Sequence, residues 1–253
     1  MTTRRKSKSQ ERQDRNKPIV VSAKTPNQKE YIIKINNNDI VFCTGPSGSG
    51  KTFIAAGIAA DKLFRGEIDK IIVTRPMISS GSDMGALPGD VDEKLGPYID
   101  PMQEKLKFFL RNYYGKFIND GCIQYRPLEL MRGATFDNSY MILDEAQNCT
   151  SQQIKMFITR MGEDSKVLIN GDTNQTDLDG HSGLAFCVNK LRFVHGVGSI
   201  QLNNSDIQRN GIIGRVLNAL EGTTTPTDQY DYDDLDSYDD FSLEDHEREM
   251  YYE

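Results

Sequence analysis

The fold is decided by one short stretch of the sequence, Gly45-Pro46-Ser47-Gly48-Ser49-Gly50-Lys51-Thr52. It matches the spacing GxxxxGK[ST] and stands between an apolar run, Ile40 to Thr44, and a helical pattern from Lys51 to about Phe64. Its glycines let backbone N–H groups turn inward around phosphate oxygens, and the N-terminus of the following helix attracts negative charge. We therefore expect all eight residues to bind a nucleotide, with Lys51 at the β- and γ-phosphates and the Thr52 hydroxyl on Mg²⁺. A fortuitous glycine-rich turn is the alternative, which the flanking strand and helix disfavour.

A second motif lies downstream, where the apolar run Met141-Ile142-Leu143 ends in Asp144 and Glu145. In a parallel sheet this places Asp144 at the carboxyl edge, beside the phosphate loop, where it can help to hold Mg²⁺. Glu145 is then positioned to orient or deprotonate an attacking water. Acidic pairs after strands also cap helices, and it is the upstream loop that favours the catalytic interpretation.

A third motif, Gly171-Asp172-Thr173-Asn174-Gln175, directly follows another apolar run. An amide side chain at this edge can donate to a phosphate oxygen and accept from water, so Gln175 is a candidate sensor of the γ-phosphate. An ordinary loop is the competing interpretation of this short segment.

Short apolar runs alternate with helical patterns along the chain, which predicts a doubly wound parallel α/β sheet of the P-loop NTPase, RecA-like type in a single domain. Helices are expected from Pro101, capped by Asp100, and from Ser151 to Met161. The region from Arg75 to Gly96 is longer than an ordinary connection and is either a functional loop or a disordered insertion. The expected strands are Ile40 to Thr44, Lys70 to Thr74, Ser139 to Leu143 and Lys166 to Asn170.

The two ends of the 253-residue chain differ in charge from the part between them. We expect a disordered basic tail over residues 1–18, an ATPase domain over 19–222, and a disordered acidic, tyrosine-rich tail over 223–253. The acidic tail accounts for the net charge of -7, which is therefore no evidence against a nucleic-acid partner. The basic tail either contacts nucleic-acid phosphates or is simply solvated.

Cysteine spacing and hydropathy suggest where the protein works. Cys43, Cys122, Cys149 and Cys187 form no CxxC or metal-ligand pattern, as expected of free thiols in a reducing cytosol. There is no signal-peptide pattern, and no window approaches the ~20 apolar residues of a membrane span. We therefore expect a cytoplasmic protein without a membrane partner.

Taken together, the motifs resemble those of the PhoH family, whose P-loop ATPase domain is related to superfamily 1 helicases. The resemblance runs in order from about Thr25 to Ala219. It rests on the phosphate loop and on "TPNQKEY" (Thr25 to Tyr31), "TRP" (Thr74 to Pro76), "LPGD" (Leu87 to Asp90), "LDEAQN" (Leu143 to Asn148), "KMFITRMG" (Lys155 to Gly162), "GDTNQTDL" (Gly171 to Leu178) and "SGL" (Ser182 to Leu184).

The resemblance implies two further site residues. Gln28 would read the adenine, and Arg209, in "SDIQRN", would contact the γ-phosphate. Without such a role, Gln28 would be a polar surface residue. Arg209 and Arg75 would each be a surface or ion-paired arginine. Two departures from the family pattern, Ala134 within "RGAT" and the sequence "QRNGI" around Arg209, leave the efficiency of hydrolysis open.

The resemblance also implies an activity and partners. We expect a Mg²⁺-dependent, helicase-like ATPase that remodels RNA or single-stranded DNA in a phosphate-starvation-type response. It would act as a homo-oligomer, with a hexameric ring as the suggested form, and the compact chain would suit a phage-encoded member. Tyr113, Tyr114 and Phe117 are candidates for base stacking. A non-catalytic nucleotide-binding regulator and a small-molecule kinase are the alternatives.

Overall fold

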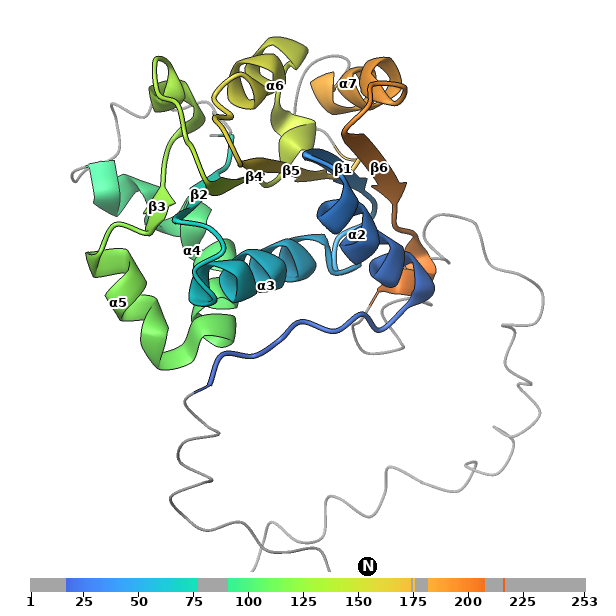
Figure 1. Ribbon diagram of the computed structural model, residues 1–253. Helices are drawn as coiled ribbons and strands as arrows, with labels where there is room; N and C mark the ends of the chain where they lie inside the picture. The colour runs from blue at the N-terminus through green and yellow to red at the C-terminus, as the bar shows by residue number, and fades with distance from the viewer. Residues whose placement is uncertain (1–16, 77–90, 174, 176–181, 208–215, 217–253) are drawn as a thin grey trace, which may run out of the picture. The chain divides into compact units, whose positions relative to one another are not determined.

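The computed structural model describes residues 17–76, 91–173, 175, 182–207 and 216, with only the backbone of 91–99 (Figure 1). The chain divides into a compact unit that ends at Gly211 and a second unit, Ile212–Glu253, of which only Val216 is described. Arg209, the "LPGD" motif and the expected tails, apart from Lys17 and Pro18 at the end of the first, lie outside the described residues.

The described strands form one parallel sheet in the order β3-β2-β4-β5-β1-β6. Because Thr44 pairs with Gly171 and Thr74 pairs with Leu143, the carboxyl ends of four strands meet at one edge. The bounds are β1 Ile40–Thr44, β2 Lys70–Thr74, β3 Ile123–Tyr125, β4 Ser139–Leu143, β5 Lys166–Gly171 and β6 Val197–Gln201.

Helices cover both faces of this sheet (Figure 1). On one face lie α2 (Pro26–Asn37), α3 (Lys51–Phe64), α4 (Val91–Leu110) and α5 (Tyr114–Asn119), and on the other α6 (Ser151–Ile158) and α7 (Gly183–Leu191). The described residues also include short 3-10 turns: η2 (Arg111–Tyr113), η3 (Leu128–Met131), η4 (Ala146–Asn148) and η5 (Asn204–Asp206).

Strand side chains alternate between two hydrophobic cores. In β1, Val41 and Cys43 pack with α2, α3 and α4, whereas Phe42 packs with α6 and α7. In β4, Ile142 belongs to the first core, and Met141 and Leu143 belong to the second. Burial on both faces explains why these strands are continuous apolar runs rather than alternating ones. The predicted doubly wound α/β fold is confirmed.

The four predicted strands are confirmed, with β5 one residue longer, and α3 has the predicted bounds. α6 begins as predicted behind a capping box of Thr150 and Gln153, but it ends at Ile158 rather than Met161. The edge strands β3 and β6 were not predicted. β3 is very short, and β6 ("VGSIQ") mixes glycine and serine with apolar residues because it is only partly buried.

The predicted start of the helix at Pro101 is wrong, because α4 already begins at Val91 and Asp100 lies inside it. An interior proline removes one backbone hydrogen bond and usually costs ~3 kcal/mol, which made Pro101 a natural first residue. Close packing on α3 offsets that cost: a Cβ on Gly57 would lie 2.8 Å from the Phe109 ring. Six residues of the supposed long loop, 91–96, are therefore helical.

No helix in the described part of the chain is long and apolar enough to cross a membrane. Among the base-stacking candidates, Tyr114 is buried in the first core and Phe117 packs against that core. Tyr113 is 37% exposed, with its ring 4.9 Å from that of Phe64.

Candidate active site

The phosphate loop connects β1 to α3 in a conformation that only glycine adopts readily. Gly45, Gly48 and Gly50 have φ values of 142°, 86° and 98°, which L side chains rarely tolerate. A Cβ on Gly45 would also lie 2.4 Å from the carbonyl oxygen of Leu202. The Gly45 N–H donates to the Gly171 carbonyl at 3.1 Å, which fixes the start of the loop to β5. The loop is therefore shaped by its backbone.

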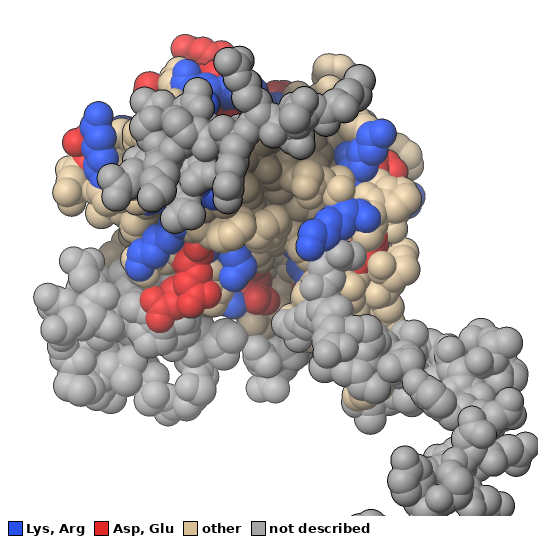
Figure 2. All heavy atoms as spheres, turned by 90° about the horizontal axis from the view of Figure 1, so that it is seen from below, with Lys and Arg blue, Asp and Glu red and all other residues tan. Residues whose placement is uncertain are grey.

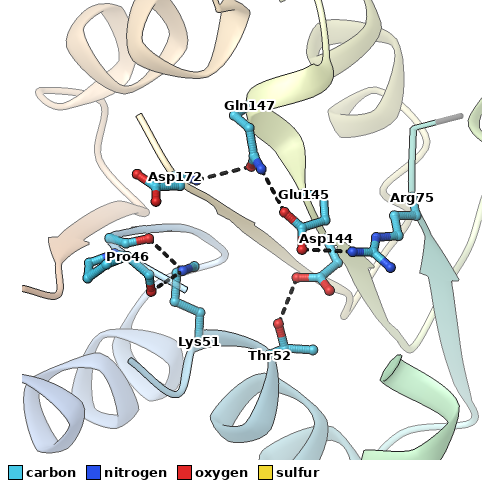
Figure 3. A network of polar contacts seen from close by, with 9 residues as sticks. Pro46, Lys51, Thr52, Arg75, Asp144, Glu145, Gln147 and Asp172 are labelled. Carbon is cyan, nitrogen blue, oxygen red and sulfur yellow. Dashed lines mark hydrogen bonds and ion pairs between the residues drawn. The ribbon is translucent and has the colours of Figure 1, made fainter. Parts of the chain in front are cut away.

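Lys51 lies within the curve of this loop (Figure 3). Its Nζ donates to the carbonyl oxygens of Gly45, at 2.5 Å, and Pro46, at 2.9 Å. Ser49 Oγ also donates to the Pro46 carbonyl, at 2.7 Å. A phosphate group in the loop would offer the lysine a charged and therefore stronger acceptor.

Thr52 and Asp144 meet across the cleft, where Thr52 Oγ1 donates to Asp144 Oδ1 at 2.9 Å. Burial, and next the nearby charge of Glu145, raise the pKa of Asp144 to about 6, against the opposing effects of Arg75, Thr52 and Lys51. Two adjacent oxygen ligands suit Mg²⁺, which takes its remaining ligands from water and phosphate. The described residues hold no group of three or more His, Cys, Asp or Glu side chains that could bind a metal by themselves.

Glu145 directly follows Asp144 and has a left-handed backbone with φ 56°. Both of its carboxylate oxygens are engaged (Figure 3). Arg75, directly after β2, donates to Oε1 at 2.7 Å, and Gln147 Nε2 donates to Oε2 at 2.6 Å. Arg75 is thus ion-paired, as the alternative to a functional role supposed, but it also lines the cleft. Sequence reasoning missed Gln147, although it lies within the "LDEAQN" motif.

Gln175 lies at the same cleft, close to the loop that follows β5. Its backbone N–H donates to the Asp172 carbonyl at 3.3 Å. Because β5 lies between β1 and β4, this loop comes between the phosphate loop and the acidic pair. Its role as a γ-phosphate sensor stays a prediction, as does that of Arg209.

Gln28 is only 3% exposed, so its interpretation as a polar surface residue is wrong. Its Oε1 accepts from the Lys24 N–H at 2.9 Å, and its Nε2 donates to the Ser49 carbonyl at 2.9 Å. It also reaches the Asp206 carbonyl at 3.4 Å. Gln28 therefore ties α2 to the phosphate loop and lines the cleft, and its implied contact with adenine stays a prediction.

Asp206 is a second residue that the sequence did not single out. It is 1% exposed, and its carboxylate accepts from Thr25 Oγ1, from Asn27 Nδ2 at 2.9 Å and from the Asn203 N–H at 2.8 Å. This joins the start of α2 to the segment that leads toward Arg209. The only available signal was its position three residues before that arginine.

These residues surround a cleft of about 640 Å³, within the usual range for a small-molecule site. Figure 2 shows basic and acidic side chains interspersed over the described part of the face viewed from below, so this view offers no continuous basic track. The cleft is lined by Ser22, Lys24, Gln28, Ser47, Gly48, Gly50, Lys51, Thr52, Phe53, Ile54, Arg75, Pro101, Lys105, Asp144, Glu145, Gly171, Asp172 and Gln175.

Comparison with known proteins gives a consistent result. The sequence model of the family described as PhoH-like protein matches residues 20–221. The chain is 41% identical over 204 residues to the PhoH-like protein of Bacillus subtilis, covering 79% of this chain and 64% of that one. It is 40% identical over 205 residues to the PhoH-like protein of Synechocystis sp., covering 80% and 62%. Protein PhoH of Escherichia coli is 38% identical over 210 residues, covering 79% and 58%. The chain thus spans less than two thirds of the length of each relative.

Proposed function

Because the chain belongs to the PhoH-like protein family, we propose that it binds Mg²⁺-ATP in the cleft at the carboxyl edge of its sheet and hydrolyses it. The observation that carries the proposal is the 2.9 Å contact between Thr52 and Asp144, directly beside the glycine-rich loop. It brings a phosphate-binding backbone and two oxygen ligands for a divalent cation to one place.

Each residue then has a defined part. The loop N–H groups and Lys51 bind the phosphates, while Thr52 and Asp144 hold Mg²⁺, which when bound neutralises charge on the β- and γ-phosphates. Glu145 orients the attacking water and accepts its proton. Gln175 and Arg209 act on the γ-phosphate, and Gln28 reads the adenine at its end of the cleft. For Glu145 to act as a base, its carboxylate must exchange one of its present partners for water.

We further propose that the ATP cycle drives remodelling of RNA or single-stranded DNA in a phosphate-starvation-type response. The family membership and the single phosphate loop support this proposal. An open cleft in one such domain suits a homo-oligomer, with a hexameric ring as the proposed form, in which a neighbouring copy supplies an arginine. Light scattering in saturating nucleotide tests this part, and a monomer would contradict it.

Phosphate release from Mg²⁺-ATP tests the activity itself, with and without single-stranded RNA and DNA, for the wild type and Lys51→Ala. The matched control is Lys62→Ala, a lysine in the last turn of the same helix. Turnover that requires Lys51, tolerates loss of Lys62 and rises with nucleic acid would support the full proposal. ATP binding without Lys51-dependent turnover would reject hydrolysis.

A non-catalytic, nucleotide-gated regulator is the second candidate. It is favoured by the two hydrogen bonds that already occupy both oxygens of Glu145. The altered sequence around Arg209 points the same way. ATP binding that changes nucleic-acid affinity without any phosphate release, in any nucleic acid tested, would select this candidate.

A further inference from the structure

We propose that Gln147 is a positioning residue for the reaction, which holds the Glu145 carboxylate and links it to the loop after β5. This role rests on the proposed function, in which Glu145 accepts a proton from the attacking water. It concerns a residue outside both the phosphate loop and the Thr52–Asp144 pair.

The geometry assigns both ends of the Gln147 side chain (Figure 3). Oε1 accepts from the Asp172 N–H at 3.0 Å, and Nε2 donates to Glu145 Oε2 at 2.6 Å. A backbone N–H can only donate, so it fixes which end of the amide faces β5. The other end must then present its N–H₂ group to the carboxylate. Neither contact can be reversed by flipping the amide.

The contact is built into the core of the site. Gln147 is 4% exposed, so a lost partner would leave a buried polar group unsatisfied. Gly171 makes room for it, because a Cβ there would lie 2.9 Å from Gln147 Oε1. A side chain at position 171 would therefore displace the amide from Glu145.

The link runs from the proposed base to the proposed sensor. Asp172 donates to Gln147 through its N–H and accepts from the Gln175 N–H through its carbonyl. Because the amide of Gln147 is planar, moving one of its ends moves the other. A shift of the loop after β5 on γ-phosphate binding would thus reach Glu145 directly, and with it the contact to Arg75. Gln147 sets the position of the base without touching the substrate.

Two substitutions separate the ends of this side chain. Gln147→Glu keeps an acceptor for the Asp172 N–H but replaces the donor that faces Glu145. Gln147→Met has a similar length and removes both contacts. Gln152→Met is the control, since Gln152 is exposed on the neighbouring helix α6. Each variant is measured for kcat and KM, for the Kd of a fluorescent ADP analogue and for Tm.

We expect both Gln147 variants to lower kcat by roughly 10- to 100-fold, because displacing a catalytic group by about 1 Å costs about that much. The ADP Kd should change by less than about threefold, since the phosphate loop is untouched. The carboxyl group introduced by Gln147→Glu can donate only when it is protonated. The activity of Gln147→Glu relative to the wild type should therefore rise as the pH falls, whereas that of Gln147→Met should not.

Several outcomes would overturn this role. Wild-type kcat in Gln147→Glu together with loss in Gln147→Met would show that only the Asp172 contact matters, which is structural support. A fall in kcat that comes with a similar fold loss of ADP affinity and with a lower Tm would likewise indicate a folding defect. Turnover that needs Lys51 but ignores both Gln147 variants overturns the role alone. A wild type without Lys51-dependent turnover overturns it together with the proposed function.

Discussion

The phosphate loop and the Glu145 corner, formed by Arg75, Glu145 and Gln147, lie at the same edge of the sheet but are built differently. The loop is shaped by three glycines with positive φ, and Lys51 is bound by carbonyls of the loop itself. The corner brings Arg75, which follows β2, together with Glu145 and Gln147, which follow β4, through a contact between residues 70 apart in sequence. A local backbone motif can be recognised in a sequence, whereas a corner of this kind emerges only when the strands are aligned. Substitutions in the loop should therefore act mainly by disturbing its backbone conformation. Substitutions in the corner should act mainly by changing the charge and hydrogen bonding of its side chains.

Glu145→Gln gives the largest expected effect and tests the chemical side of this comparison. The amide keeps its length but cannot accept a proton from water, so kcat should fall by about 10²- to 10⁴-fold. ADP affinity should stay within about threefold of the wild type. Glu104→Gln is the control, because Glu104 is 73% exposed in α4. Unchanged turnover in Glu145→Gln would remove this residue from the chemistry.

Gly45→Ala tests the loop in the opposite way. Its positive-φ backbone costs an alanine about 1–3 kcal/mol, and the added Cβ would lie 2.4 Å from the Leu202 carbonyl. Both the free energy of unfolding and ADP affinity should therefore fall, measured by denaturant titration and by fluorescence. Gly115→Ala is the control: that position has open space, so its stability should hold or rise. If Gly45→Ala bound ADP normally, the positive-φ backbone at this position would not be required for nucleotide binding.

Asp144→Asn separates stability from function at the border of the two regions. The pKa of Asp144 is raised from 3.8 to about 6 by folding, so the native state holds its proton more tightly than the unfolded chain. The metal-free wild type should therefore lose ~1–3 kcal/mol from this group as the pH rises from about 4 to 7. In EDTA, Asp144→Asn should make the protein more stable by that amount at about pH 7, and the gain should vanish near pH 4.

The same variant should bind Mg²⁺-ATP more weakly, because an amide oxygen is a poorer ligand than a carboxylate. Denaturant melts at the two pH values and nucleotide titrations with and without Mg²⁺ measure the two effects. A variant less stable than the wild type at neutral pH would contradict the stability part.

Arg75→Gln should have the smallest effect on folding. The side chains of the Arg75–Glu145 pair are 23% and 38% exposed, and ion pairs that contact solvent contribute about 0–1 kcal/mol. A change in Tm of only a few degrees is therefore expected. Turnover should change more than stability, because Glu145 loses one of its two partners. A large loss of stability would make the corner a structural feature instead.

The sequence predicted the parts of this molecule whose determinants are local. Buried parallel strands are visible as apolar runs, and the loop is visible because its glycines are required by its own backbone. The start of α4 was missed because Pro101 usually marks a first turn, and only packing on α3 keeps it inside the helix. The sequence did not predict the burial of three polar residues, Gln28, Gln147 and Asp206. A polar residue becomes buried only when partners from other segments of the chain meet it.

One planar unit spans the two regions: the peptide between Gly171 and Asp172. Its carbonyl accepts from the Gly45 N–H at 3.1 Å, and its N–H donates to Gln147 at 3.0 Å. Because the two groups share a rigid plane, any tilt of the peptide is felt on both sides at once. The ¹⁵N–¹H signal of Asp172 would therefore serve as a spectroscopic reporter for both regions. It should respond to nucleotide at the loop and to substitution at position 147, without any probe being attached to the protein.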